Sequence, residues 1–148
     1  MALKATNDLN SKLVTQAVGT GGALNAAFVE LFTNVGLSSG ADTAYSDLIL
    51  PSYTGYTRQA VTWSAPVKNS SGSYEVVGQV VLNKMTGGTS SATVTGYALT
   101  TGVSVSTLEA TEIFSTPVNV AGVGDFVAVV PIFSIPSDAD LGDAAQIV

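Results

Sequence analysis

The sequence predicts an all-β protein, and three observations support this prediction. Runs in which apolar and polar residues alternate recur along the chain, as they do in strands with one buried face. Clusters of Gly, Ser, Asn and Pro separate these runs at intervals of roughly 8–15 residues. Hydrophobic residues make up 46% of the 148 residues and charged residues 11%, which is the composition of a folded chain with a core. We therefore expect an antiparallel β-sandwich, immunoglobulin-like or jelly-roll-like, of about six to eight strands.

The sandwich is expected to form a single domain over residues 1–148, with different structure at its two ends. Residues 3–18 carry apolar positions at a spacing close to 3.6, and Gly19–Gly22 follows as a helix stop. This pattern predicts a short helix in an N-terminal arm, residues 1–22. Residues 136–148 form an acidic C-terminal tail.

Six segments between these ends have the pattern of strands. They are Ala26–Thr33, Tyr56–Ser64, Tyr74–Lys84, Ala92–Thr100, Glu109–Phe114 and Phe126–Ile135. Gly78 lies midway along the third and predicts a bulge there. Turns are expected at Pro117–Val120 and Gly122–Asp125. The last segment is apolar on both faces, which favours a central strand or one under an inter-subunit contact.

The residue types present exclude several kinds of chemistry. The chain has no Cys and no His, so it has no disulfide, no thiolate, no His-ligated zinc and no Ser-His-Asp triad. Glu109 and Glu112 are three apart in a strand and are expected on opposite faces, unlike a glycosidase pair. Asp138–Asp143 lacks the spacing of a calcium loop and is interpreted as a solvated tail. We expect no enzymatic activity, no cofactor and no metal.

The charge balance bears on partners. A net charge of −6 with five basic residues provides no cluster for nucleic acid and no basic patch for a membrane surface. So few charges on an apolar chain favour burial of surface between subunits. We expect a homo-oligomer, with a trimer as one form; the alternative is a monomer with a surface coated by Ser and Thr.

The only arginine and the only tryptophan lie in one strand-like run, Tyr56–Pro66. Arg58 is interpreted either as an anchor for a partner or as one half of an internal ion pair with Glu30. Trp63 is expected on the opposite face of the strand, as a core anchor.

Four blocks of this chain, in order, resemble a family of small virion structural proteins of tailed bacteriophages, and one of them, Val94–Leu99, matches the family's "VTHFGIF" strand only loosely. Val29-Glu30-Leu31-Phe32-Thr33 is similar to the family's "LALFT" strand, and Tyr56–Pro66 to its "YARQAVTFGAP" strand. Glu112–Phe126 is similar to "ALTTPKTVNAGDTFSF", and the resemblance covers roughly residues 24–135. The chain departs from the pattern in an enlarged loop at 34–55, an extra strand at 74–84 and the acidic tail.

The resemblance implies a non-enzymatic structural protein located in the virion and assembled in the host cytoplasm. Its favoured role is capsid decoration or cement, with the major capsid protein or other virion proteins as partners. The alternative is a tail-fibre or baseplate-associated module that binds a host receptor or glycan. The expected contact surfaces are the 34–55 loop, the N-terminal helix and the C-terminal tail, and the tyrosines that bracket the loop are of a residue type enriched at interfaces. The candidate interface residues are Tyr45, Leu48, Ile49, Leu50, Tyr53, Tyr56 and Arg58.

Overall fold

The computed structural model describes residues 28–37, 44–100 and 108–135. These residues form nine strands and one 3-10 helix, and every strand pairing among them is antiparallel. The all-β prediction is confirmed for this part of the chain. The helical arm expected over residues 1–22 and the C-terminal tail lie outside the described residues. The chain divides into two compact units, with 62–79 and 131–135 in unit 1 and the remaining described residues in unit 2.

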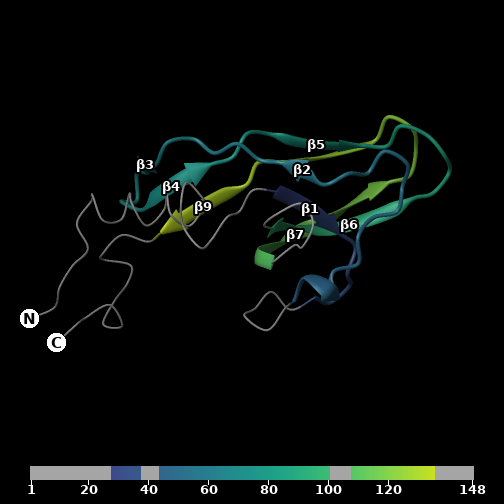
Figure 1. The fold of residues 1–148 in the computed structure, drawn as a ribbon, viewed down its shortest axis with the longest axis horizontal. Helices are drawn as coiled ribbons and strands as arrows, with labels where there is room; N and C mark the ends of the chain where they lie inside the picture. Colours follow the sequence, from purple (N-terminus) through teal and green to yellow (C-terminus); the bar gives the residue numbers. More distant parts are fainter. Residues whose placement is uncertain (1–27, 38–43, 101–107, 136–148) are drawn as a thin grey trace, which may run out of the picture. The chain divides into compact units, whose positions relative to one another are not determined.

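The larger sheet of unit 2 has the strand order β2-β1-β6-β7 (Figure 1). Its strands are β1 (Phe28–Phe32), β2 (Gln59–Ala60), β6 (Ala92–Thr100) and β7 (Leu108–Val120). The two central strands, β1 and β6, are buried along most of their length on both faces, and in β1 the apolar sequence Phe-Val-Glu-Leu-Phe predicts this. Phe32 pairs with Gly96, and a Cβ on Gly96 would lie 2.5 Å from the Phe32 ring. Only glycine therefore fits opposite Phe32.

Strand β7 differs from the prediction, which ended the strand at Phe114 and placed a turn at Pro117. The strand continues to Val120. Val94 pairs with Val118 whereas Gly96 pairs with Ile113, so residues 114–117 lie opposite Thr95 alone. The residues of this bulge make no ladder pairs with β6, and the other side of β7 is the edge of the sheet. The missing N–H of Pro117 therefore removes no hydrogen bond from the sheet.

Two predicted long strands each prove to be two strands. The Tyr74–Lys84 segment forms β4 (Tyr74–Val77) and β5 (Val81–Lys84), and Phe126–Ile135 forms β8 (Phe126–Val129) and β9 (Ile132–Ile135). The breaks lie at Gly78 and Pro131, where the Gly78 N–H donates to the Pro131 carbonyl at 2.8 Å. Glycine weakens a strand and proline cannot donate to a ladder, so the breaks have a local cause.

Unit 1 contains the sheet β3-β4-β9, in which β3 is Val67–Lys68. Val76 of β4 is its buried centre, and Trp63, Tyr74 and Phe133 pack against Val76. Trp63 is thus a half-buried member of a small core, as expected. The predicted strand Tyr56–Ser64 is wrong in extent, because only Gln59–Ala60 and an isolated bridge from Trp63 to Gly78 pair.

In unit 2, β5 and β8 form a separate two-stranded sheet. Its inner residues are Val81 and Asn83 on β5 and Val127 and Val129 on β8, and all four are buried. Strand β8 is apolar on both faces, as expected, but only one of them is buried, so it is not a central strand of unit 2. The alternative, a position under an inter-subunit contact, stays a prediction.

Candidate functional site

Arg58 and Glu30 form an ion pair within unit 2. The Arg58 Nε lies 3.1 Å from Glu30 Oε1, and the side chains are 22% and 3% exposed. The guanidinium also lies over the Phe28 ring, 5.0 Å from its centroid. The second oxygen, Glu30 Oε2, is buried without a hydrogen-bond partner. The internal ion pair expected from the sequence is confirmed. It joins Arg58, in the segment before β2, to Glu30 of β1 and so stabilises both segments.

The tyrosines that follow the loop face inward. Tyr53 is 2% exposed, and its ring packs edge-on against Tyr56 with centroids 5.8 Å apart. The Tyr56 hydroxyl accepts from the Leu31 N–H at 3.1 Å and donates to the Leu31 carbonyl at 3.3 Å. Burial raises the pKa of Tyr56 well above its usual range, and nearby Glu30 adds to the rise. Both side chains therefore act as structural supports for β1.

The other candidate residues lie on a segment that docks on the end of β1. Tyr45 is in the 3-10 helix η1 (Tyr45–Asp47), and the following backbone is held by Asn34, which accepts from the Ile49 N–H at 2.7 Å. Thr33 N–H also donates to the Ile49 carbonyl at 2.8 Å. These hydrogen bonds dock the segment on the end of β1 within unit 2.

The same segment leaves apolar side chains in contact with solvent. Ile49 is 60% exposed and Leu50 37%. They border a shallow hollow of about 320 Å³ that also contacts the start of β6 at Ala92. Tyr45 and Leu48 are half-buried. Four of the seven predicted residues thus share one surface segment, while Tyr53, Tyr56 and Arg58 belong to the interior of unit 2.

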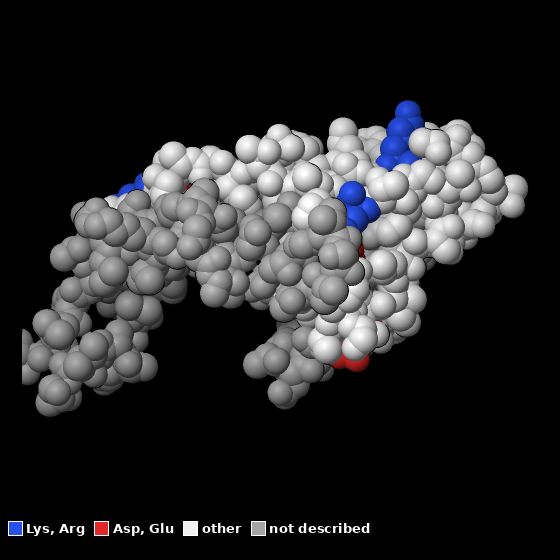
Figure 2. Space-filling view, in the orientation of Figure 1, with Lys and Arg blue, Asp and Glu red and all other residues white. Residues whose placement is uncertain are grey.

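A further group of exposed apolar side chains lies elsewhere, on the outward face of β5 and β8 and just beyond their paired ends. We call it the outer face and define it as Val80, Leu82, Lys84, Phe126, Ala128 and Val130. Val80 and Phe126 are each 57% exposed, Leu82 56% and Val130 47%. Lys84 is its single charge. Figure 2, which shows one side of the molecule, likewise has charged side chains only in scattered places.

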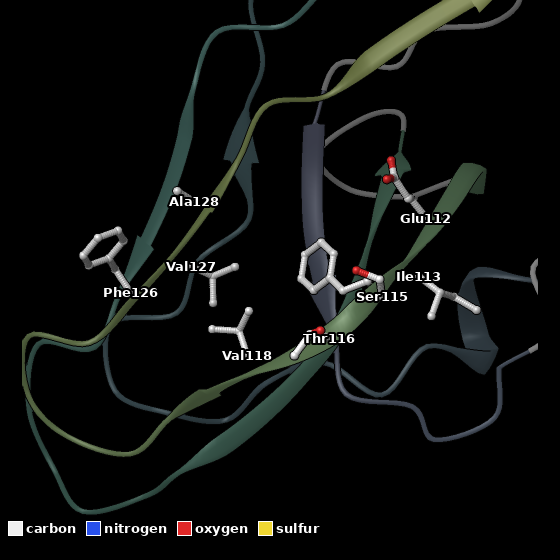
Figure 3. Close-up of a pocket in the computed structure, with 9 residues that line it drawn as sticks. Glu112, Ile113, Ser115, Thr116, Val118, Phe126, Val127 and Ala128 are labelled. Carbon is white, nitrogen blue, oxygen red and sulfur yellow. The ribbon is translucent and has the colours of Figure 1, made fainter.

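A groove of about 490 Å³ adjoins the outer face, between β7 and β8 (Figure 3). These strands follow one another through a turn closed by Asp125, whose carboxylate accepts from the Ala121 and Gly122 N–H groups at 3.0 and 2.9 Å. They belong to different sheets, so the hairpin is splayed. Val118 and Val127 point into the gap, whereas Phe126 points away from it.

The groove carries one acidic group and no evident catalytic arrangement. Glu112 lines it and accepts a hydrogen bond from the Tyr97 hydroxyl at 2.6 Å. Burial raises the pKa of Tyr97 well above its usual range, and the Glu112 hydrogen bond adds to the rise. Tyr97 thus remains a neutral donor to Glu112, a structural pair at the base of the groove.

The sequence interpretation missed the outer face, although a signal for it was present. In 80–84 and in 126–130 most residues are apolar, whichever face of the strand they occupy. A two-stranded sheet has only one covered face, so one of the two apolar sets had to meet solvent or a partner. Assigning these segments to long central strands hid that consequence.

The described residues include no group of three or more His, Cys, Asp or Glu side chains placed to hold a metal ion. Within the same ranges, no helix has the length and apolar character needed to cross a bilayer. No family model, curated protein or solved structure matches this chain.

Proposed function

We propose that this chain is a non-enzymatic structural protein of a tailed-phage virion, and that it serves as a capsid decoration or cement subunit. The resemblance of its sequence blocks to small virion proteins supports the class. The outer face supports the mode of action, because a protein that acts by burying surface must first expose surface of that kind. The partners in this proposal are the major capsid protein and other copies of the chain.

The outer face is the observation that carries the proposal. Monomeric proteins rarely expose contiguous apolar patches larger than a few hundred Å², and the largest patch on a protein surface is often functional. Four aliphatic or aromatic side chains, each about half exposed, lie together here on two paired strands. A cement protein holds neighbouring capsomers together by burying such surface at their joints, so its function needs no reactive group.

The packing proposed for the chain is a β-sandwich. In unit 2, β1 and β6 are buried on both faces, and the β5–β8 sheet has one buried face. Two layers with their apolar sides together are the arrangement that such patterns favour. The two central strands form the rigid layer, and the exposed ribbon is the layer available to partners.

Nucleic acid and glycans are poorer partners on the observations available. Of the basic residues, Arg58 is occupied by Glu30, and the chain carries a net charge of −6. A tail-fibre module that binds a glycan through loop tyrosines loses two of its three candidates, since Tyr53 is buried and Tyr56 is bonded to Leu31. This alternative therefore rests on Tyr45 alone.

The proposal is tested by composition and rebinding of phage particles. Particles of the phage whose genome encodes the chain are purified by density gradient, and the chain is quantified against the major capsid protein by mass spectrometry. A decoration protein is present at a fixed ratio near that of the capsid lattice. A tail module is present in a few copies per particle, and absence from the particle refutes the virion role altogether.

Rebinding of purified variants to particles identifies the surface by which the chain binds the virion. Particles lacking the chain are mixed with purified wild-type protein, with Leu82→Lys, or with the control Val35→Lys. Val35 is 95% exposed in the turn after β1 and contributes nothing to the outer face. Loss of binding or of capsid stabilisation in Leu82→Lys alone supports the proposal, whereas equal binding of all three proteins contradicts the role given to the outer face.

A further inference from the structure

We propose that the outer face pairs with the outer face of a second copy of this chain, about a two-fold axis parallel to strands β5 and β8. The inference rests on the proposed function only in needing this face buried. It goes beyond that function by naming the partner, the symmetry and the contacts. The argument comes from the register of the two strands, from the sizes of the side chains and from the position of the single charge.

The register arranges the outer face in three cross-strand rows. Leu82 pairs with Ala128 and Lys84 pairs with Phe126. Val80 and Val130 lie one residue beyond the last pair of the ladder, Val81 with Val129, and continuing the register places them beside each other as a third row. The rows lie about 7 Å apart along the ribbon.

A two-fold axis along the strands places β5 of one copy over β8 of the other, row against row. Leu82 then lies over the partner's Ala128, and the partner's Leu82 lies over Ala128, so a large side chain meets a small one twice. Facing positions that alternate in size interdigitate, as packed sheets require. Val80 meets the partner's Val130 in the next row. The surface is thus complementary to itself under this rotation.

The same rotation accounts for the one charged residue. Lys84 of one copy lies over the Phe126 ring of the other, where its alkyl chain covers apolar surface and its ammonium group can contact the ring face. With the sheets about 10 Å apart and the strands about 4.8 Å apart, the Cα atoms of the two Lys84 residues are separated by roughly 11 Å.

The surface area that the outer face can bury sets the expected strength of the dimer. From the exposed fractions of its residues, the outer face presents about 450 Å² per copy, within the range of a functional patch. A symmetric pair then buries at most about 900 Å², which is below the roughly 1,000 Å² of a stable specific contact and in the range of weak, transient ones. We therefore expect a weak, reversible dimer, which a virion lattice would reinforce. Because the contact is apolar and each copy carries −6, added salt should strengthen it.

The experiment is sedimentation equilibrium of the full chain over a wide concentration range, with three proteins. Wild type is expected to show a monomer–dimer equilibrium, Leu82→Lys an association at least 10-fold weaker, and Val35→Lys an association equal to that of wild type. Leu82 is 56% exposed, so the substitution leaves the fold intact, which circular dichroism checks. A monomeric wild type, a trimer, or an unaffected Leu82→Lys dimer would overturn the proposal.

Cross-linking tests the axis without relying on a disruptive variant. The chain has no cysteine, so Leu82→Cys and Ala128→Cys each introduce a single thiol. Mixed and treated with a short bis-maleimide, they should give more cross-linked dimer than either variant treated alone, and Val35→Cys should give none. Absence of that excess overturns the geometry. A dimer that is absent from virions refutes only the proposed function, whereas a monomer that binds particles refutes only the pairing.

Discussion

Replacing Arg58 with methionine tests the energetic account of the buried ion pair. The substitution keeps the alkyl length of the side chain and removes the guanidinium, which leaves Glu30 charged and 3% exposed. The carboxylate has no second partner in place, because Glu30 Oε2 is buried without a hydrogen bond. The contact between the guanidinium and the Phe28 ring is lost as well.

The expected loss of stability is about 3 kcal/mol. Breaking a buried ion pair by removing one partner costs about 3–5 kcal/mol, since the remaining charge is left in a poor environment. Arg58 is 22% exposed, so water reaches one side of the pair and the lower end of that range applies. The cation–π contact contributes up to about 1 kcal/mol of this loss.

The assay is urea unfolding followed by far-ultraviolet circular dichroism. With a urea dependence of about 2 kcal/mol per molar, a loss of 3 kcal/mol lowers the midpoint by about 1.5 M. Fluorescence of Trp63 is unsuitable as the only probe, because Trp63 belongs to unit 1 and the pair belongs to unit 2. Arg58→Lys, which retains the charge but lacks the planar fork, should fall between wild type and Arg58→Met.

The double variant Glu30→Gln with Arg58→Met is the matched control. Removing both charges should leave the free energy of unfolding only about 1 kcal/mol below that of wild type, because a buried pair is often replaceable by neutral groups of similar volume. The single variant Glu30→Gln completes the cycle, and because it too leaves one partner of the pair alone, the coupling energy should be at least about 2 kcal/mol. A loss below about 1 kcal/mol in Arg58→Met, or a double variant no better than the single one, refutes the reasoning.

Two further predictions concern strand β6. Gly96→Ala should cost at least 1–3 kcal/mol, because its Cβ would lie 2.2 Å from the backbone oxygen of Glu112 and 2.5 Å from the Phe32 ring. Gly87→Ala, whose Cβ meets nothing closer than 3.7 Å, is the control in thermal unfolding; equal effects would contradict the packing described here. Tyr97→Phe concerns alkaline stability. Burial and Glu112 raise the pKa of Tyr97, so the unfolded chain ionises first, and stability present below about pH 10 declines as pH rises further. Tyr97→Phe should be less stable at neutral pH by about 1 kcal/mol and should decline less steeply above pH 10; an unchanged slope in urea unfolding at each pH contradicts this assignment.

The sequence allowed the all-β class, strand β6 and the Arg58–Glu30 pair to be predicted. The Ala92–Thr100 run matches its strand in full, because its residues alternate and its neighbours supply pairing on both sides. Glu30 and Arg58 were the scarce opposite charges in two apolar segments. A lone charge in such a segment needs a partner, so charge scarcity itself identified the pair.

The missed features depend on pairing between distant segments. Gly78 could be a bulge or a strand end from local pattern alone, and its bond to Pro131 decides that it is an end. Pro117 usually marks a turn, yet the bulge opposite Thr95 lets β7 continue through it. The outer face was missed for the same reason, since which side of β5 and β8 is covered depends on their partners and not on their own residues.

Cryo-electron microscopy of the intact virion tests the central claim most directly. The account predicts density for this chain at the joints of the capsid lattice, with Leu82 and Phe126 buried in a contact with a second copy or with the major capsid protein. Density confined to the tail, or copies on the capsid whose outer face points into solvent, would contradict it.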